Sequence, residues 1–180
     1  MNHVDFDAAR SVEEWKTVDD PVMGGRSHSH VHWVDAPVDY GEAERGFLRF
    51  EGIVSLANNG GFCSARLVDD DRGVTDFDDL DAFRLLVRGD GHRYKFTVRT
   101  DDTPPKSSWR HPFEPPSGPW TELVLPFTDF ELWRRGTHLS AGARLDPTRI
   151  RSVGVLISDK QDGPFRIDLA RVRLHRSASI

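Results

Sequence analysis

Only one cysteine, Cys63, occurs among the 180 residues, so the chain cannot form an internal disulfide and suits a reducing compartment. Long apolar runs are missing too: no stretch approaches the roughly 20 residues that a membrane-spanning helix needs. The formal net charge of −5 leaves no excess of cations for phosphate contact, so we expect no nucleic-acid partner. Lysine is scarce, with 4 lysines against 20 arginines, a bias that we attribute to a GC-rich bacterial genome.

The sequence also lacks the motifs that mark common catalytic sites. No Gly-x-Ser-x-Gly elbow, phosphate-binding loop or dinucleotide-binding glycine pattern occurs. Cys63 has no identifiable imidazole partner and is expected to be buried as a small apolar side chain. We therefore predict a protein that is not an enzyme and uses no cofactor. The amino terminus, Met1–Asp7, resembles neither a signal peptide nor a transit peptide, which predicts a cytoplasmic location.

The chain does contain a series of short segments in which apolar and polar residues alternate as in β-strands. These segments are 27–34, 47–55, 62–67, 82–87, 93–100, 121–125, 150–157 and 165–175. About eight or nine strands with little helix, separated by turn residues, favour an all-β sandwich, and the chain length suits one domain over residues 1–180. We further expect a short helical turn from Thr128 to Trp133, and a long loop or edge strand in the proline-rich stretch 101–119.

Glycine pairs mark two turns between these segments. The first pair is Gly24-Gly25, and the second closes the stretch Asn58-Asn59-Gly60-Gly61. Asparagine and glycine tolerate left-handed backbone angles, so the second stretch predicts a tight hairpin. The stretch from Gly89 to His92 predicts another hairpin on the same grounds.

Several motifs recur in one order along the chain. They are Trp15 to Asp20, Pro21 to Ser27, Phe50-Glu51-Gly52, Asn58 to Phe62 with Ser64 and Arg66, Arg88 to Gly91 before Tyr94, Leu125-Pro126-Phe127 with Phe130, Arg135-Gly136, and Gln161 to Phe165. Together they resemble the complex I intermediate-associated protein family, whose mitochondrial members help assemble respiratory NADH dehydrogenase. The resemblance implies a jelly-roll β-sandwich like that of galactose-binding domains, and a protein partner such as a subunit of a membrane complex.

Polar residues in or beside the glycine turns are the candidate ligand-binding or partner-binding residues, with one tryptophan as an aromatic platform. They are Asp20, Arg26, Asn58, Asn59, Arg66, Arg88, Asp90, Trp109 and Gln161. Two arrangements fit them: an open polar patch, or internal pairs of opposite charge. Together with the resemblance, an open patch predicts an assembly chaperone that holds a partner polypeptide. The alternative is a carbohydrate-binding module that binds a glycan without catalysis.

Histidines and acidic residues are the candidates for metal binding. His28, His30 and His32 alternate along one segment, so a strand would place three imidazoles on one face, and two of them can share a zinc ion. No further ligand is identifiable, so an exposed polar face without a metal is the prediction. The acidic residues of 69–81 lack EF-hand spacing, and we expect a solvated loop there, with structural calcium as the alternative.

Overall fold

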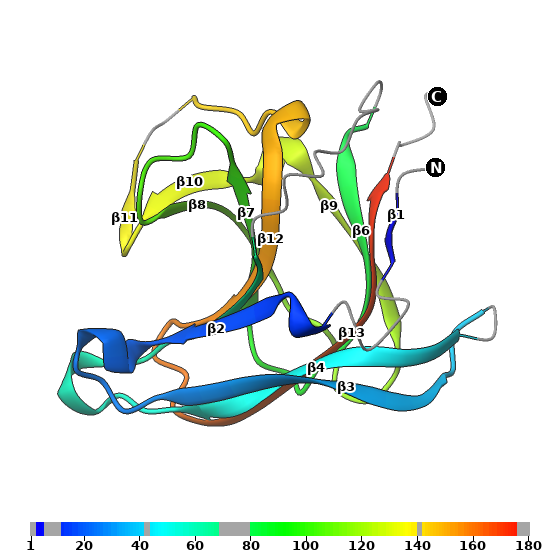
Figure 1. The fold of residues 1–180 in the computed structure, drawn as a ribbon, viewed down its shortest axis with the longest axis horizontal. Coiled ribbons are helices and arrows are strands. Elements are labelled where there is room, and N and C mark those ends of the chain that lie inside the picture. The colour runs from blue at the N-terminus through cyan, green and yellow to red at the C-terminus, as the bar shows by residue number, and fades with distance from the viewer. Residues whose placement is uncertain (1–2, 6–11, 42–43, 69–79, 140–141, 176–180) are drawn as a thin grey trace.

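Two antiparallel β-sheets stack face to face in the computed structural model, which describes residues 3–5, 12–41, 44–68, 80–139 and 142–175 (Figure 1). The first sheet has the order β3-β4-β13-β6-β9, with β1 beside β13. Its strands are β3 (His28–Val38), β4 (Glu44–Val54), β13 (Gly163–His175), β6 (Ala82–Arg88), β9 (Thr121–Pro126) and β1 (His3–Asp5). The second sheet has the order β11-β10-β8-β7-β12-β5-β2. Its strands are β11 (Thr137–His138), β10 (Glu131–Arg134), β8 (Ser107–Phe113), β7 (Tyr94–Thr100), β12 (Ile150–Ile157), β5 (Cys63–Leu67) and β2 (Trp15–Asp19).

Short 3-10 helices occupy some of the connections. They are η1 (Asp20–Met23), η2 (Ala57–Asn59), η3 (Phe127–Asp129) and η4 (Pro147–Arg149). Within the described ranges, no helix is long and apolar enough to cross a membrane. The acidic stretch 69–79, considered above for calcium, lies outside the described residues.

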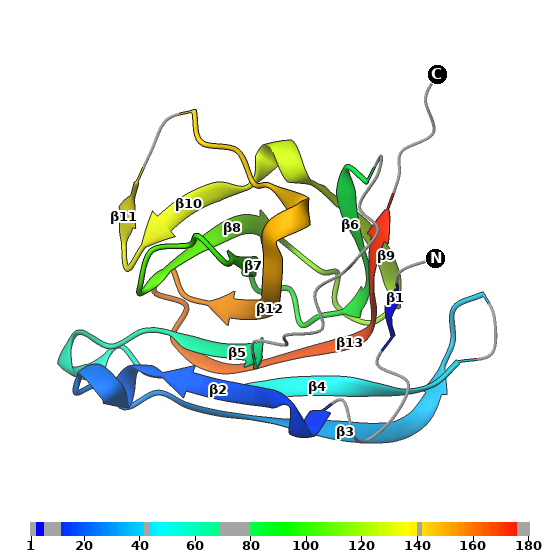
Figure 2. The same cartoon turned by 45° about the horizontal axis from the view of Figure 1, so that its top comes forward.

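Alternate side chains of both sheets fill the space between them. In β7, Tyr94, Phe96 and Val98 point inward and are buried, and Phe83 of the first sheet packs against Phe96 with ring centroids 5.0 Å apart. Figure 2 shows how β2 and β5 of the second sheet lie over β3 and β4 of the first. Burial of one side chain in two along each strand is the reason that alternation predicts these strands. The predicted all-β sandwich is confirmed.

Strand pairing overrides two local predictions. The helical turn expected from Thr128 to Trp133 is wrong after its first residues, because η3 ends at Asp129 and β10 then pairs with β8. The proline-rich stretch is neither a loop nor an edge throughout, since it contains β8 between β7 and β10. Pro112 lies beyond the residues of β8 that pair with β10. The pairing of these two strands therefore does not require the N–H that proline lacks.

Both predicted hairpins are also wrong, because each turn carries the chain from one sheet to the other. β4 belongs to the first sheet and β5 to the second, and β6 and β7 are divided in the same way. A turn motif specifies a reversal of the chain but not the strand that pairs next, which depends on segments distant in sequence. We call residues 20–27, between β2 and β3, the first corner, and residues 55–62, between β4 and β5, the second corner.

Asp20 joins the first corner to the second. Its carboxylate is 1% exposed and accepts hydrogen bonds from the amide of Ser27, at 2.8 Å, and from the Ser27 hydroxyl. From the second corner, the amides of Gly61 and Phe62 donate to the same carboxylate at 2.6 and 3.3 Å. One buried side chain therefore satisfies backbone groups of two segments about forty residues apart in the sequence.

The glycine pairs make this arrangement possible. In each pair one glycine has a positive φ, 89° at Gly24 and 130° at Gly61, and the other lies against Asp20. A Cβ on Gly25 or Gly60 would collide with the carboxylate, so both corners close around it only because these positions carry no side chain. Burial opposes ionisation of Asp20, but the hydrogen bonds from Ser27 and the backbone amides outweigh it and lower its pKa.

We expect Asp20→Ala to lower the free energy of unfolding by about 2–4 kcal/mol, because several buried donors lose their only charged acceptor. Chemical denaturation followed by tryptophan fluorescence measures this change. Asp39→Ala, in the exposed loop after β3, removes a carboxylate with no partner among the described residues and serves as the control. Equal stability of the two variants would contradict the role of Asp20.

The same carboxylate predicts a pH dependence. Because the folded-state pKa is lowered, ionised Asp20 stabilises the fold above the ordinary aspartate pKa of about 3.9, and this contribution is lost as the pH falls through the lower folded-state value. The stability difference between wild type and Asp20→Asn should be largest near pH 7 and shrink as the pH falls below the ordinary aspartate value of about 3.9. Urea titrations across this range measure it, and a constant difference at all pH values would refute the assignment.

Candidate functional site

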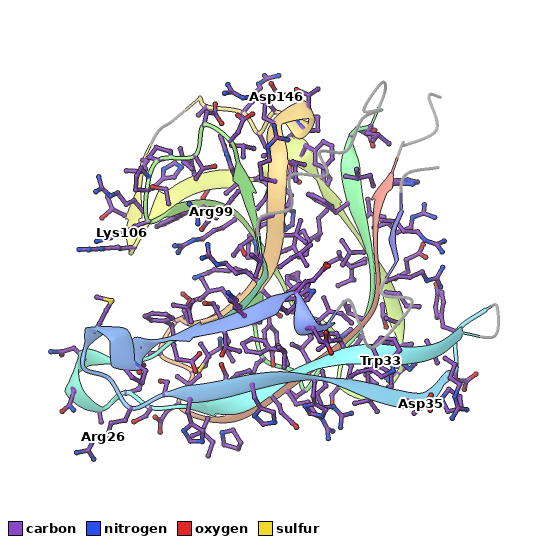
Figure 3. The ribbon with its side chains drawn as sticks, in the orientation of Figure 1. Arg26, Trp33, Asp35, Arg99, Lys106 and Asp146 are labelled. Carbon is purple, nitrogen blue, oxygen red and sulfur yellow. The ribbon has the colours of Figure 1, made fainter. Side chains whose placement is uncertain are left out.

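The candidate residues taken from the sequence divide between several places, and some hold the corners together. Asp20 ties the first corner to the second, as described above. The side-chain amide of Asn58 donates to the carbonyl oxygen of Gly24 at 3.2 Å, which adds a second link between the same two corners. Arg26 and Asn59 are exposed there and have no side-chain partner among the described residues. Figure 3 shows Arg26 extending away from the sandwich.

Asp90 and Gln161 bind the backbone at neighbouring crossings between the sheets. The Asp90 carboxylate accepts hydrogen bonds from the Tyr94 hydroxyl at 3.0 Å and from the amide of Arg166 at 2.7 Å. The Gln161 side chain accepts from the amide of Arg93 at 2.9 Å and donates to the carbonyl oxygen of the same residue at 2.8 Å. Asp90 thus connects the turn before β7 with β13 itself, and Gln161 connects that turn with the segment that leads into β13.

Arg88 lies on the outward face of the first sheet, in an internal ion-pair network. The Asp168 carboxylate, 2% exposed, accepts from Arg88 at 2.7 Å and from Arg49 at 2.7 Å. The Arg88 guanidinium also lies over the rings of Trp120 and Phe47, at 4.7 and 5.3 Å from their centroids. Its hydrogen-bonding and stacking capacity is therefore used within the protein.

The remaining two candidates are in contrasting positions. Trp109 is 7% exposed and packs in the core, so its ring offers no exposed platform. Arg66 is exposed and lies on the outward face of the second sheet, because its neighbours Cys63 and Ala65 in β5 point inward. The nine residues do not converge on one place, and Arg66 leads to a different candidate surface.

Cationic side chains gather on the outward face of the second sheet. Register aligns Lys16 of β2, Arg66 of β5, Gly154 of β12, Thr97 of β7 and Arg110 of β8 in one row across the sheet. Lys95 and Arg99 flank Thr97 on the same face of β7, since Tyr94, Phe96 and Val98 face the core. We call Lys16, Arg66, Lys95, Arg99 and Arg110 the basic face.

The second sheet is curved, and its outward face is the concave one (Figure 1). Figure 3 shows Arg99 extending from β7 towards the space that the sheet partly encloses, and Lys106, from the turn before β8, at the mouth of that space. In the middle of the row, a Cβ on Gly154 would lie 2.5 Å from the carbonyl oxygen of Ala65 and 2.8 Å from Thr97 Oγ1. No side chain therefore separates Arg66 from Thr97 at the centre of this face.

Most of these cations have no acidic partner in the part of the chain that the structure describes. Within the ranges described, Lys16, Arg66 and Arg99 form no ion pair or side-chain hydrogen bond, and Arg110 donates only to the Ser108 hydroxyl, at 3.0 Å. Burial lowers the pKa of the Arg110 guanidinium, an effect that the charge of Asp159 partly offsets.

Lys95 is the exception on the basic face, because it has an acidic partner. Its ammonium group binds Asp159 at 2.6 Å and donates to the Ser158 hydroxyl at 2.9 Å. Burial alone would raise the pKa of Asp159, but the hydrogen bond and charge of Lys95 lower it.

One aromatic side chain borders the basic face. Trp133 of β10 is half-buried, pairs in register with Ser108 of β8 and donates from Nε1 to Glu131 at 3.2 Å. Its ring lies 5.3 Å from that of His138 in β11. The face thus combines guanidinium groups that can bind carboxylates in pairs of hydrogen bonds with an apolar ring at one edge.

Sequence reasoning missed most of the basic face. Alternation in Tyr94–Thr100 indicated one part of it, because Lys95, Thr97 and Arg99 occupy every second position between buried residues and so share the outward face of the strand. No local pattern indicated that Arg110 would lie beside them, since it falls in the proline-rich stretch for which a long loop or an edge strand was predicted, with no indication of its neighbours in the sheet. Cys63, by contrast, is buried as expected, and burial raises the pKa of its thiol to about 12, so the unreactive thiol form persists at neutral pH.

Solved structures with the same β-sandwich fold include carbohydrate-binding modules. A family 11 carbohydrate-binding module of a cellulosomal cellulase from Clostridium thermocellum superposes with a TM-score of 0.67 at 13% identity, covering 100% of this chain and 99% of that one. An exo-β-agarase superposes with a TM-score of 0.65 at 9% identity, covering 99% of this chain and 26% of that one. At these identities the likeness establishes the fold alone.

Sequence comparison establishes the family. Complex I intermediate-associated protein 30, mitochondrial, of Neurospora crassa is 23% identical over 195 residues, covering 93% of this chain and 70% of that protein. The Mus musculus protein of the same name is 23% identical over 183 residues, covering 91% of this chain and 52% of that protein. The sequence profile of this family matches residues 4–169. The chain therefore belongs to the complex I intermediate-associated protein 30 family.

Proposed function

We propose that this protein is a non-enzymatic binding protein that holds a partner polypeptide during assembly of a respiratory or other membrane complex, and that the basic face contacts that partner. Family membership and the names of the relatives support the assembly role. The observation that carries the proposed site is a set of cations, Lys16, Arg66 and Arg99, that have no partner among the described residues and lie on one face of a chain whose net charge is −5.

Cations that form no ion pair within the described residues favour binding to an acidic segment of the partner polypeptide. A guanidinium group already paired inside the protein, such as Arg88, would have to lose that pairing before binding another carboxylate. Within the described ranges, Arg66 and Arg99 have no such pairing to lose, and arginine binds carboxylates through two parallel hydrogen bonds. Complementary charge also increases the rate of encounter and determines the orientation of the partner.

The first and second corners extend this contact surface. β2, which carries Lys16, leads directly into the first corner, where Arg26 is exposed and Met23 is 66% exposed. Asn59 is exposed in the second corner. In this proposal Asp20, Asp90 and Gln161 keep the corners in position, while the exposed side chains make contact.

Charge reversal on the basic face tests the proposal. We expect the triple variant Lys16→Glu/Arg66→Glu/Arg99→Glu to fold normally but to bind its partner at least about tenfold more weakly, because attraction becomes repulsion. The measurement is affinity purification of the tagged full chain from solubilised membranes, with quantitative mass spectrometry of respiratory and other membrane-complex subunits.

A matched triple variant reverses three exposed arginines away from the basic face: Arg45→Glu/Arg144→Glu/Arg166→Glu. It has the same net charge as the first variant and should retain the partner. If wild type recovers no membrane-complex subunit, the assembly proposal fails. If both triple variants retain a recovered subunit equally well, the subunit binds elsewhere and the basic face is not the site.

A glycan-binding function is the second candidate, and Trp133 is the observation that favours it. A half-exposed aromatic ring beside arginine side chains provides the stacking surface and the hydrogen bonds that sugar ligands use. In a glycan array probed with the full chain, this function predicts saturable binding that Trp133→Ala abolishes and Trp133→Tyr largely keeps. An array without a saturable signal, or binding unchanged in Trp133→Ala, would reject it.

A further inference from the structure

Two histidines and a glutamate converge on the outward face of the first sheet, opposite the basic face. His30 and His32 alternate along β3 and point outward, and their rings stack with centroids 5.3 Å apart and an interplanar angle of 16°. Glu51 lies directly across from His30 in β4. This acid is the further ligand that sequence spacing could not identify, because it belongs to another strand.

The three side chains direct their donor atoms to a common point. Glu51 Oε1 lies 3.4 Å from His30 Nε2 and 3.8 Å from His32 Nε2, and the three donor atoms all lie within 4.8 Å of one another. In a tetrahedral zinc site with bonds of about 2.0–2.2 Å, ligand atoms are roughly 3.4 Å apart. The two distances from Glu51 to the histidines are close to that value, so side-chain rotations would complete a site.

None of the three groups serves the interior of the protein. The side chains of His30, His32 and Glu51 are 61%, 41% and 30% exposed. Glu51 would have a purely structural role if it paired with Arg49, two residues before it in β4. The Arg49 guanidinium instead donates two hydrogen bonds to Asp168, at 2.7 and 3.0 Å. Glu51 therefore faces two imidazoles, while the neighbouring Arg49 is already hydrogen-bonded to Asp168.

We propose that His30, His32 and Glu51 form a zinc-binding site on the outward face of β3 and β4. Two imidazole nitrogens and one carboxylate oxygen are a donor set that zinc accepts, and three protein ligands leave one tetrahedral position for water or for a group from outside. Strand alternation places both histidines on one face, and cross-strand pairing brings the carboxylate to them. The site is independent of the basic face and of the proposed assembly role.

Titration of the metal-free full chain with zinc chloride by isothermal calorimetry tests the site. We expect saturable binding of one zinc ion per chain, weakened at least about tenfold in each of His30→Ala, His32→Ala and Glu51→Gln. All three side chains are partly exposed, so the variants should fold, which circular dichroism verifies. His138→Ala removes an exposed histidine from the second sheet and should bind zinc as wild type does.

Two results would overturn the proposal. One is a titration of the wild type without saturable heat at micromolar protein. The other is wild-type affinity in His30→Ala and His32→Ala, which would place any bound zinc elsewhere. Chemical shifts of the imidazole protons, followed by NMR during the titration, distinguish the sites directly, because only His30 and His32 should shift with the first equivalent of zinc.

Discussion

The carboxylate of Asp20 is the constraint on which the rest of the structure depends. It lies between two corners that each carry the chain from one sheet to the other, and it satisfies backbone amides of both. Because the corners are linked, β2 and β5 are held against β3 and β4, and the outward faces of both sheets take fixed positions. The glycine pairs are a consequence of this arrangement, since a side chain on Gly25 or Gly60 would displace the carboxylate.

The two outward faces use the same residue types in different ways. On the first sheet, Arg49 and Arg88 share the buried carboxylate of Asp168, so their charges are neutralised within the protein. On the second sheet, Arg66 and Arg99 have no such partner in the described part of the chain. An internal acid thus decides whether an arginine stabilises the sandwich or remains available to another molecule.

Sequence reasoning predicted the fold class because alternation is a local signal of burial on one face of a strand. It failed for the hairpins expected at Asn58–Gly61 and Gly89–His92, since local turn chemistry contains no information about which strands pair. It was also incomplete for the candidate sites. Asp20 was identified as polar and turn-associated, but only the folded chain shows that its partners are Ser27 and Gly61.

The sequence by itself determined which residues face inward, where the chain turns, and to which family the protein belongs, because all three depend on patterns within short segments. Tertiary structure alone decided that the turns cross between sheets, that Arg66 and Arg110 share a row, and that Glu51 meets His30. These juxtapositions depend on the order and register of strands, which form from segments far apart in the chain.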